Sequence, residues 1–147
     1  MKLVIQRVNM AKVTRVESGK IVGEIGKGLF ILLGIKKGDT AKEVNELVNK
    51  VTKLRVISDE NDKMNLSVMD TKSEVLLVSQ FTLYANTKDG NRPSFIEAEE
   101  PDRAKELYEQ FVKGLRGGGI TVATVSFGDY MKIETVLDGP VTIVLEN

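Results

Sequence analysis

The chain has 147 residues, and its 21 basic side chains balance 21 acidic ones, so its formal net charge is zero. This length fits one domain spanning residues 1–147, which buries roughly two-thirds of the unfolded chain's surface without a metal or a disulfide. There is neither histidine nor cysteine, which excludes a Ser-His-Asp triad, a thiol nucleophile and the common zinc sites. We therefore expect no metal and no cofactor.

Charge and hydropathy also limit the partners. A balanced charge lacks the basic excess of strong non-specific nucleic-acid binders, so no DNA partner is expected, and any RNA must be held by a local patch or by shape. The longest apolar run, Gly28 to Ile35, is far shorter than the roughly 18 residues that span a membrane. The start, Met1 to Arg7, lacks the apolar region of a signal peptide. We expect a cytoplasmic protein without a membrane partner.

Short apolar segments predict strands along the first part of the chain. Ser18-Gly19 is typical of a two-residue hairpin turn, and Gly26 to Gly28 of a second turn. The run from Leu29 to Ile35 is apolar throughout, which indicates a strand buried on both faces. The strands expected here are Met1–Val8, Ala11–Glu17, Lys20–Ile25 and Leu29–Ile35.

Two longer segments predict helices. Thr40 and Glu43 have the spacing of a capping box, and apolar residues recur at helical spacing from Ala41 to about Arg55. Pro101 is well placed as the first residue of a second helix, which the glycines at 117–119 end. Its expected buried face consists of Ala104, Leu107, Tyr108, Phe111, Val112 and Leu115.

The fold class follows from the sum of these elements. The remaining apolar segments predict the strands Met64–Met69, Glu74–Ser79, Ile120–Val125, Lys132–Leu137 and Val141–Leu145. Hairpins come first and helices later, which is typical of a mixed α/β domain. We expect mostly antiparallel, barrel-like β-sheet layers packed against two main helices in a single domain.

The segment Ser79-Gln80-Phe81-Thr82 follows an apolar strand. Polar and aromatic residues at the tip of a buried strand often line a site, because the scaffold holds them rigidly. Alternatively, their hydroxyl groups satisfy neighbouring backbone groups at a strand end. Thr82 is not identified as a nucleophile, because the chain has no imidazole to activate it.

Two further segments have both a functional and an ordinary interpretation. Lys88 and Arg92 could hold phosphate, Arg92 through a bidentate fork, although a solvated surface loop also accounts for them. Asp138-Gly139-Pro140 lies between two expected strands and has the composition of a turn with proline opening an edge strand. Sequence alone gives no reason to expect a cis bond there.

Together these segments resemble the D-aminoacyl-tRNA deacylases, first described as D-tyrosyl-tRNA deacylases. The Ser79 to Thr82 stretch is the most specific part of the resemblance. The shared segments run in the family's order along the whole chain: Gln6-Arg7-Val8, Ile25 to Leu29, Lys63 to Ser67, Val78 to Leu83, Gly90 to Phe95, Phe127-Gly128 with Met131, and Gly139 to Thr142.

The resemblance implies a homodimer that acts on D-aminoacyl-tRNA, with active sites at the subunit interface. It implies that Gly139 and Pro140 form a cis peptide that reaches into the partner's pocket, where their carbonyl groups meet the substrate's amino group and exclude an L side chain. Arg7 would orient this peptide. The catalytic pocket floor would be Ser79, Gln80, Phe81 and Thr82, with Phe127 and Met131 as walls and Lys88 and Arg92 touching the tRNA.

The chain departs from the family pattern at three places. Leu137 stands where the family has asparagine, and we expect it to brace the Gly-Pro turn by packing. Asp129-Tyr130 stand where small residues are common, and Val125 where the family has glycine.

The resemblance also implies a mechanism that needs no histidine, in which the substrate's ribose hydroxyl and main-chain donors carry the reaction. A pocket that excludes L side chains accepts many D-amino acids and also glycyl-tRNA. Two alternatives stay open. One is a non-catalytic RNA-binding module that uses Lys88 and Arg92, and the other is a hydrolase of small-molecule esters on the same scaffold.

Overall fold

A curved six-stranded sheet forms the centre of the computed structural model, which describes residues 1–88 and 90–147. Its strand order is β2-β1-β3-β6-β7, and β8 pairs with β1 as well. The β3–β6 and β6–β7 pairs are parallel and the other three are antiparallel, which confirms the expected mixed class. The strands are β1 (Lys2–Arg15), β2 (Ile21–Ile25), β3 (Gly28–Gly34), β6 (Glu74–Ser79), β7 (Val122–Thr124) and β8 (Met131–Glu146).

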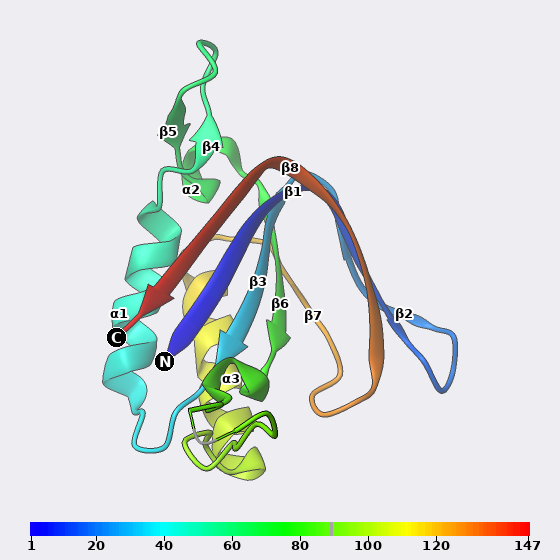
Figure 1. The fold of residues 1–147 in the computed structure, drawn as a ribbon. Helices are drawn as coiled ribbons and strands as arrows, with labels where there is room; N and C mark the ends of the chain where they lie inside the picture. Colours follow the sequence, from blue (N-terminus) through cyan, green and yellow to red (C-terminus); the bar gives the residue numbers. More distant parts are fainter. Residues whose placement is uncertain (89) are drawn as a thin grey trace.

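Two helices, α1 (Ala41–Lys53) and α3 (Pro101–Gly117), cover one face of the sheet (Figure 1). The expected capping box between Thr40 and Glu43 is present at the start of α1. All six residues expected on the buried face of α3 are buried. They pack with α1 against the side chains of β3 and β6 that point to this face, so the main core lies between the helices and the sheet.

A second, smaller core lies on the other face of the sheet. It contains Phe30 of β3 and Leu76 of β6, whose sequence neighbours Leu29, Ile31 and Leu77 belong to the main core. This alternation follows from the two-residue repeat of a strand. It confirms that the apolar run of β3 is buried on both faces. The far half of β1 bends over with β2 and part of β8 to cover this second core, giving a barrel-like curve (Figure 1).

Several expected element boundaries are wrong. The segments Met1–Val8 and Ala11–Glu17 form the single strand β1, and the two last expected strands form the single strand β8. Both strands are continuous because the β1–β8 pairing continues past two register shifts. These shifts lie between Gln6 and Val8 and between Val8 and Met10. The hairpin loop after β1 is also longer than two residues, because β2 begins only at Ile21.

The segment Met64–Met69 is only partly a strand. β5 (Met64–Leu66) pairs with β4 (Ile57–Ser58), and then Ser67 starts the short helix α2 (Val68–Thr71). The Ser67 hydroxyl accepts a bond from the Asp70 N–H, and the Asp70 carboxylate accepts from the Ser67 N–H at 2.8 Å. This capping box is visible in the sequence, but the apolar residues around it indicated a strand.

Candidate active site

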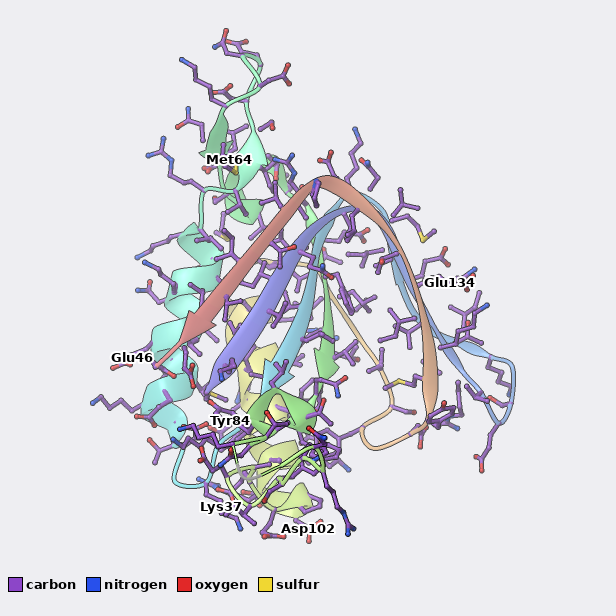
Figure 2. All side chains as sticks on the ribbon, viewed as in Figure 1. Lys37, Glu46, Met64, Tyr84, Asp102 and Glu134 are labelled. Atoms are coloured by element: carbon purple, nitrogen blue, oxygen red, sulfur yellow. The ribbon has the colours of Figure 1, made fainter. Side chains whose placement is uncertain are left out.

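A cavity of about 550 Å³ opens at the end of β6, a size typical of small-ligand pockets. Its wall brings together Ser79, Phe81, Phe95, Phe127 and Gly128 with Ala98 and other residues of the segment before α3 and its first turn. Phe81 and Phe95 pack edge to face with ring centroids 5.1 Å apart. In Figure 2, Lys37, Tyr84 and Asp102 mark this end of the molecule, where Lys37 also lines the cavity.

The chain turns sharply where β6 ends, because the short 3₁₀ helix η1 (Phe81–Tyr84) begins there. The Gln80 N–H donates to the Leu33 carbonyl at 2.8 Å, which is the last bond toward β3. Gly34 lets η1 pack closely on β3, since a Cβ at this position would lie 2.9 Å from the Leu83 Cβ. A side chain at position 34 would therefore displace the segment that lines the cavity.

The first amides of η1 are unused donors. The Leu83 N–H donates to the Gln80 carbonyl at 3.2 Å, and the Ala85 N–H to the Thr82 carbonyl at 3.0 Å. The N–H groups of Phe81 and Thr82 have no acceptor among the described residues, as expected for the first turn of a helix. Two free main-chain donors therefore lie beside the cavity wall formed by Ser79 and Phe81.

The Thr82 hydroxyl is not activated. It accepts a hydrogen bond of 2.5 Å from the Gln80 side-chain amide, and Thr82 is exposed. An amide nitrogen cannot take the hydroxyl proton, so this contact does not make Thr82 a nucleophile. The geometry favours a binding role for both side chains.

Gly139 and Pro140 lie far from this cavity within the same subunit. Pairing between β1 and β8 is interrupted here: Gln6 pairs with Thr142 and Val8 with Leu137, so residues 138–141 bulge out opposite Arg7. The Gly139–Pro140 peptide bond is cis, Gly139 has a φ of 126°, and both residues are exposed.

Arg7 holds this bulge in place. Its Nε lies 2.9 Å from the Asp138 carboxylate and donates to the Asp138 carbonyl at 3.3 Å. Its Nη1 donates to the Val56 carbonyl at 3.0 Å and to the Ser58 hydroxyl at 3.1 Å. The guanidinium thus ties the residue before Gly139 to the β4 region. Leu137 is 42% exposed in the single chain, so its expected packing role beside the turn stays a prediction.

The two expected wall residues differ in position. Phe127 lines the cavity and packs edge to face on Tyr108, with centroids 5.8 Å apart. The Tyr108 hydroxyl donates to the Leu77 carbonyl of β6 at 2.9 Å, and burial raises the pKa of Tyr108 to about 12. Met131 packs instead against the second core and is not among the described residues that line the cavity.

The two expected tRNA contacts lie in an exposed loop beside the cavity. Backbone bonds between Asn86 and Ser94, at 2.8 and 2.9 Å, close this loop. Lys88 lines a separate hollow of about 280 Å³ with Lys2 and Tyr84, and Arg92 is exposed. Neither side chain belongs to the larger cavity.

Sequence reasoning missed several lining residues. Phe95 is identified from the sequence only as the end of the shared segment Gly90 to Phe95, and Ile35, Ala98 and Ala104 carry no functional signal. Ala104 lines the cavity at the start of α3 and is also part of the core, so helical spacing identifies it only as buried.

No helix in residues 1–88 and 90–147 is long and apolar enough to cross a membrane. In the same part of the chain, acidic side chains do not gather into a group of three or more that could hold a metal ion.

Comparisons with known proteins cover nearly the whole chain. The family model described as D-Tyr-tRNA(Tyr) deacylase matches residues 4–146. The D-aminoacyl-tRNA deacylase of Fusobacterium nucleatum is 53% identical over 146 residues, which covers 99% of this chain and 95% of the relative. The D-aminoacyl-tRNA deacylase of Aquifex aeolicus is 51% identical over 147 residues, which covers 100% of this chain and 98% of the relative.

Solved structures agree with this match. The structure of a c-Myc DNA unwinding element binding protein superposes with a TM-score of 0.92 at 42% identity, covering 100% of this chain and 99% of that one. A probable eukaryotic D-amino acid tRNA deacylase superposes with a TM-score of 0.83 at 14% identity, covering 98% and 97%. The second likeness shows the fold alone.

Proposed function

Because the chain belongs to the D-Tyr-tRNA(Tyr) deacylase family, we propose that it hydrolyses the ester bond of D-aminoacyl-tRNA, releasing the free D-amino acid and the tRNA. The observation that carries this proposal is the end-to-end match to D-aminoacyl-tRNA deacylases at about half identical residues. The cavity at Ser79 and Phe81 is of a size that accepts an aminoacyl group. The protein would act in the cytoplasm, where charged tRNA is used.

The reaction proceeds without an acid–base side chain. The ester carbonyl lies at the cavity wall near Ser79 and Phe81, and the free N–H groups of Phe81 and Thr82 receive the developing oxyanion. One such donor lowers the activation barrier by about 2.7–4 kcal/mol. The ribose hydroxyl beside the ester, held together with a water, contributes several kcal/mol more through proximity. Ser79, Gln80, Phe81 and Thr82 then act by binding and positioning.

Chiral selection requires a second copy of the chain. Ser79 pairs with Leu33 of β3, whereas the bulge at Gly139 adjoins Val8, which pairs with Gly28. Gly28 and Leu33 are five residues apart on one strand, a distance of about 16 Å at the usual rise per residue. Gly139 is therefore too far to touch an amino acid in its own subunit's cavity, and we assign it to the partner's.

The surface of β8 supports a homodimer. Among the described strands β8 pairs only with β1, so it presents a long free edge. Val136, Leu137 and Val144 on this strand are 49%, 42% and 59% exposed. A partner that covers them would also give Leu137 a packing role, in place of the polar bond that an asparagine would make.

In the dimer, the Gly139 and Pro140 carbonyl groups of one subunit meet the substrate's amino group in the other and leave no room for an L side chain. Arg7 and Asp138 position this peptide, and Phe127 forms a wall of the cavity, whereas Met131 packs against the second core. Because selection works by exclusion, many D-amino acids and glycyl-tRNA are accepted. Lys88 and Arg92 touch the tRNA outside the cavity.

The deciding experiment compares matched D- and L-tyrosyl-tRNA, with and without a metal chelator. We expect fast deacylation of the D form alone, unchanged by chelator. A non-catalytic RNA-binding module would bind both tRNAs and release nothing. A small-molecule hydrolase would cleave free D-tyrosine esters as readily as the charged tRNA. Equal rates on both enantiomers would overturn the proposed selectivity.

A further inference from the structure

A second groove runs along α3 next to the ester cavity. It has a volume of about 640 Å³ and is lined by Lys105, Tyr108, Val112, Lys113, Arg116 and Phe127, among others. Phe127 also lines the cavity that holds Ser79 and Phe81, so the two hollows share this residue. α3 begins at the cavity, where Pro101 and Ala104 form part of the wall, and its later residues, from Lys105 to Gly117, line the groove.

The charge of this groove is positive. Lys105, Lys113 and Arg116 face a single carboxylate, that of Glu109. None of the ion pairs formed by the described residues includes Lys105, Lys113 or Arg116, whereas Arg103 elsewhere on α3 pairs with Glu106 at 2.6 Å. The chain as a whole has no net charge, so this local excess distinguishes the groove.

The spacing and the aromatic ring suit a single RNA strand. Lys105 and Lys113 are two α-helical turns apart, which places them about 12 Å from each other along the helix axis. Proteins that hold single-stranded nucleic acid combine a basic groove along the backbone with aromatic rings on which bases stack. Phe127 lines both the groove and the cavity, and Tyr108, anchored to Leu77, supports its ring.

We propose that the unpaired 3′ end of the aminoacyl-tRNA leaves the ester cavity past Phe127 and lies along α3, where Lys105 and Lys113 bind its phosphates. This rests on the proposed function. Arg116 is partly fixed by donating to the Val122 carbonyl at 2.8 Å, so it contributes mainly charge. The loop with Lys88 is separated from this path by η1, since Lys88 lines the hollow on the Leu83 and Tyr84 side.

The test compares two substrates that share the ester but differ in length. One is full D-tyrosyl-tRNA and the other is D-tyrosyl-adenosine, which ends before the proposed groove. In the variant Lys105→Ala/Lys113→Ala we expect KM for the tRNA to rise roughly tenfold, as when two exposed ion pairs are lost. Activity on D-tyrosyl-adenosine should not change. The salt dependence of log KM should become shallower by about 1.4, the value for two phosphate contacts with a single strand.

The matched control is Lys42→Ala/Lys50→Ala. These two exposed lysines have the same spacing on α1, whereas Val48 and Thr52 are on the side of α1 that approaches α3. Both double variants remove the same charge from an exposed helix, and thermal unfolding confirms that each remains folded. The control should leave KM for the tRNA near the wild-type value.

The outcomes separate this proposal from the proposed function. Three results would overturn the proposal that the groove binds the 3′ end of the tRNA. They are an unchanged KM for the tRNA, an equal change in both double variants, and an equal loss of activity on D-tyrosyl-adenosine. If the wild-type protein hydrolyses neither substrate, the proposed function fails. Binding of uncharged tRNA to the two double variants then tests the groove independently of hydrolysis, and weaker binding is expected only for the α3 variant.

Discussion

Ser79 and Gly139 lie near opposite ends of the same sheet, although both belong to the segments that most resemble a deacylase site. Ser79 pairs with Leu33 at one end of β3, and the bulge with Gly139 lies by Val8 and Gly28 at the other. A site that uses both residues must therefore be built from two subunits. This arrangement predicts that two inactive variants, each changed at one of the two segments, regain activity when they form mixed dimers.

The pair for this experiment is Phe81→Asp, which puts a charge into the apolar cavity, and Gly139→Ala. A Cβ at Gly139 would lie 2.8 Å from the Val141 nitrogen, and its φ of 126° disfavours a side chain. We expect each variant alone to be a dimer with little activity on D-tyrosyl-tRNA. After co-refolding in equal amounts, half of the dimers are mixed and each has one intact site of two, so about a quarter of the wild-type sites return.

Light scattering before and after mixing controls for assembly. A mixture no more active than its components would show that the two residues do not share a site across the interface. Full chiral activity from a protein that stays monomeric at the assay concentration would contradict the dimer itself.

Thr82→Ala should keep kcat within about tenfold of the wild type, because a positioned acid–base side chain is worth roughly 10²–10⁴-fold and Thr82 has no such role. Its hydroxyl contacts only the Gln80 amide among the described side chains. Single-turnover rates on D-tyrosyl-tRNA measure the effect on chemistry. Gln80→Ala is the matched control, since it removes the other partner of the same bond. Inactivity of a folded Thr82→Ala dimer would contradict this and indicate that Thr82 is the nucleophile.

The substrate's own hydroxyl should matter more than Thr82. On D-tyrosyl-tRNA whose terminal ribose lacks the hydroxyl beside the ester, we expect a loss of at least a hundredfold, since a well-placed reacting group supplies several kcal/mol. The measurement is a single-turnover rate at saturating enzyme. Undiminished hydrolysis of this substrate would reject substrate assistance.

Helices and the buried strand β3 could be predicted from the sequence because their signals are local. The box of Thr40 and Glu43 and the apolar stripe of α3 act within a few residues. The long strands β1 and β8 could not be bounded in the same way. Their continuity depends on pairing with each other across more than a hundred residues, and this pairing tolerates bulges that resemble strand ends.

The candidate site was predicted only in part for a similar reason. The motif from Ser79 to Thr82 identifies one wall, whereas Ala98 and Ala104 line the cavity only because α3 packs where it does. The contact of Arg7 with Asp138 also depends on strand register, which sets residues 138–141 opposite Arg7. No local pattern encodes that register.

The Glu43 carboxylate should account for part of the fall in melting temperature at acid pH. Hydrogen bonds, first from the Thr40 side chain, lower the pKa of Glu43 from 4.5 to about 2. A lowered pKa in the folded state means that the stabilisation is present above the unfolded pKa and is lost as pH falls through the folded one. We expect the melting temperature of Glu43→Gln to fall less steeply than that of the wild type between pH 5 and 2.

The control is Glu46→Gln on the same helix, because the Glu46 carboxylate lies outside the capping box. Its melting temperature should follow the wild-type curve. A Glu43→Gln protein whose acid profile matched the wild type throughout would contradict the role of the box.

The ion pair between Arg15 and Asp129 predicts a specific effect on substrate binding. One guanidinium nitrogen of Arg15 lies 2.5 Å from the Asp129 carboxylate and also donates to the Ser126 hydroxyl. These contacts hold both ends of the short segment that carries Phe127, whose ring forms a wall of the ester cavity.

The comparison pair is Lys12 of β1 and Glu134 of β8, which lie 3.2 Å apart and are similarly exposed. Exposed or half-exposed pairs of this kind contribute about 0.2–1 kcal/mol to stability, so double-mutant cycles of urea unfolding should give similar small coupling energies for both. Only the Arg15 pair should affect substrate binding.

We expect Arg15→Ala and Asp129→Ala each to raise KM for D-tyrosyl-tRNA several-fold with a smaller change in kcat. The double variant should be no worse than either single one, and the exchanged pair Arg15→Asp/Asp129→Arg should recover part of the loss. If the Lys12 and Glu134 variants raise KM equally, the effect is one of general stability, and the clamp on Phe127 is rejected.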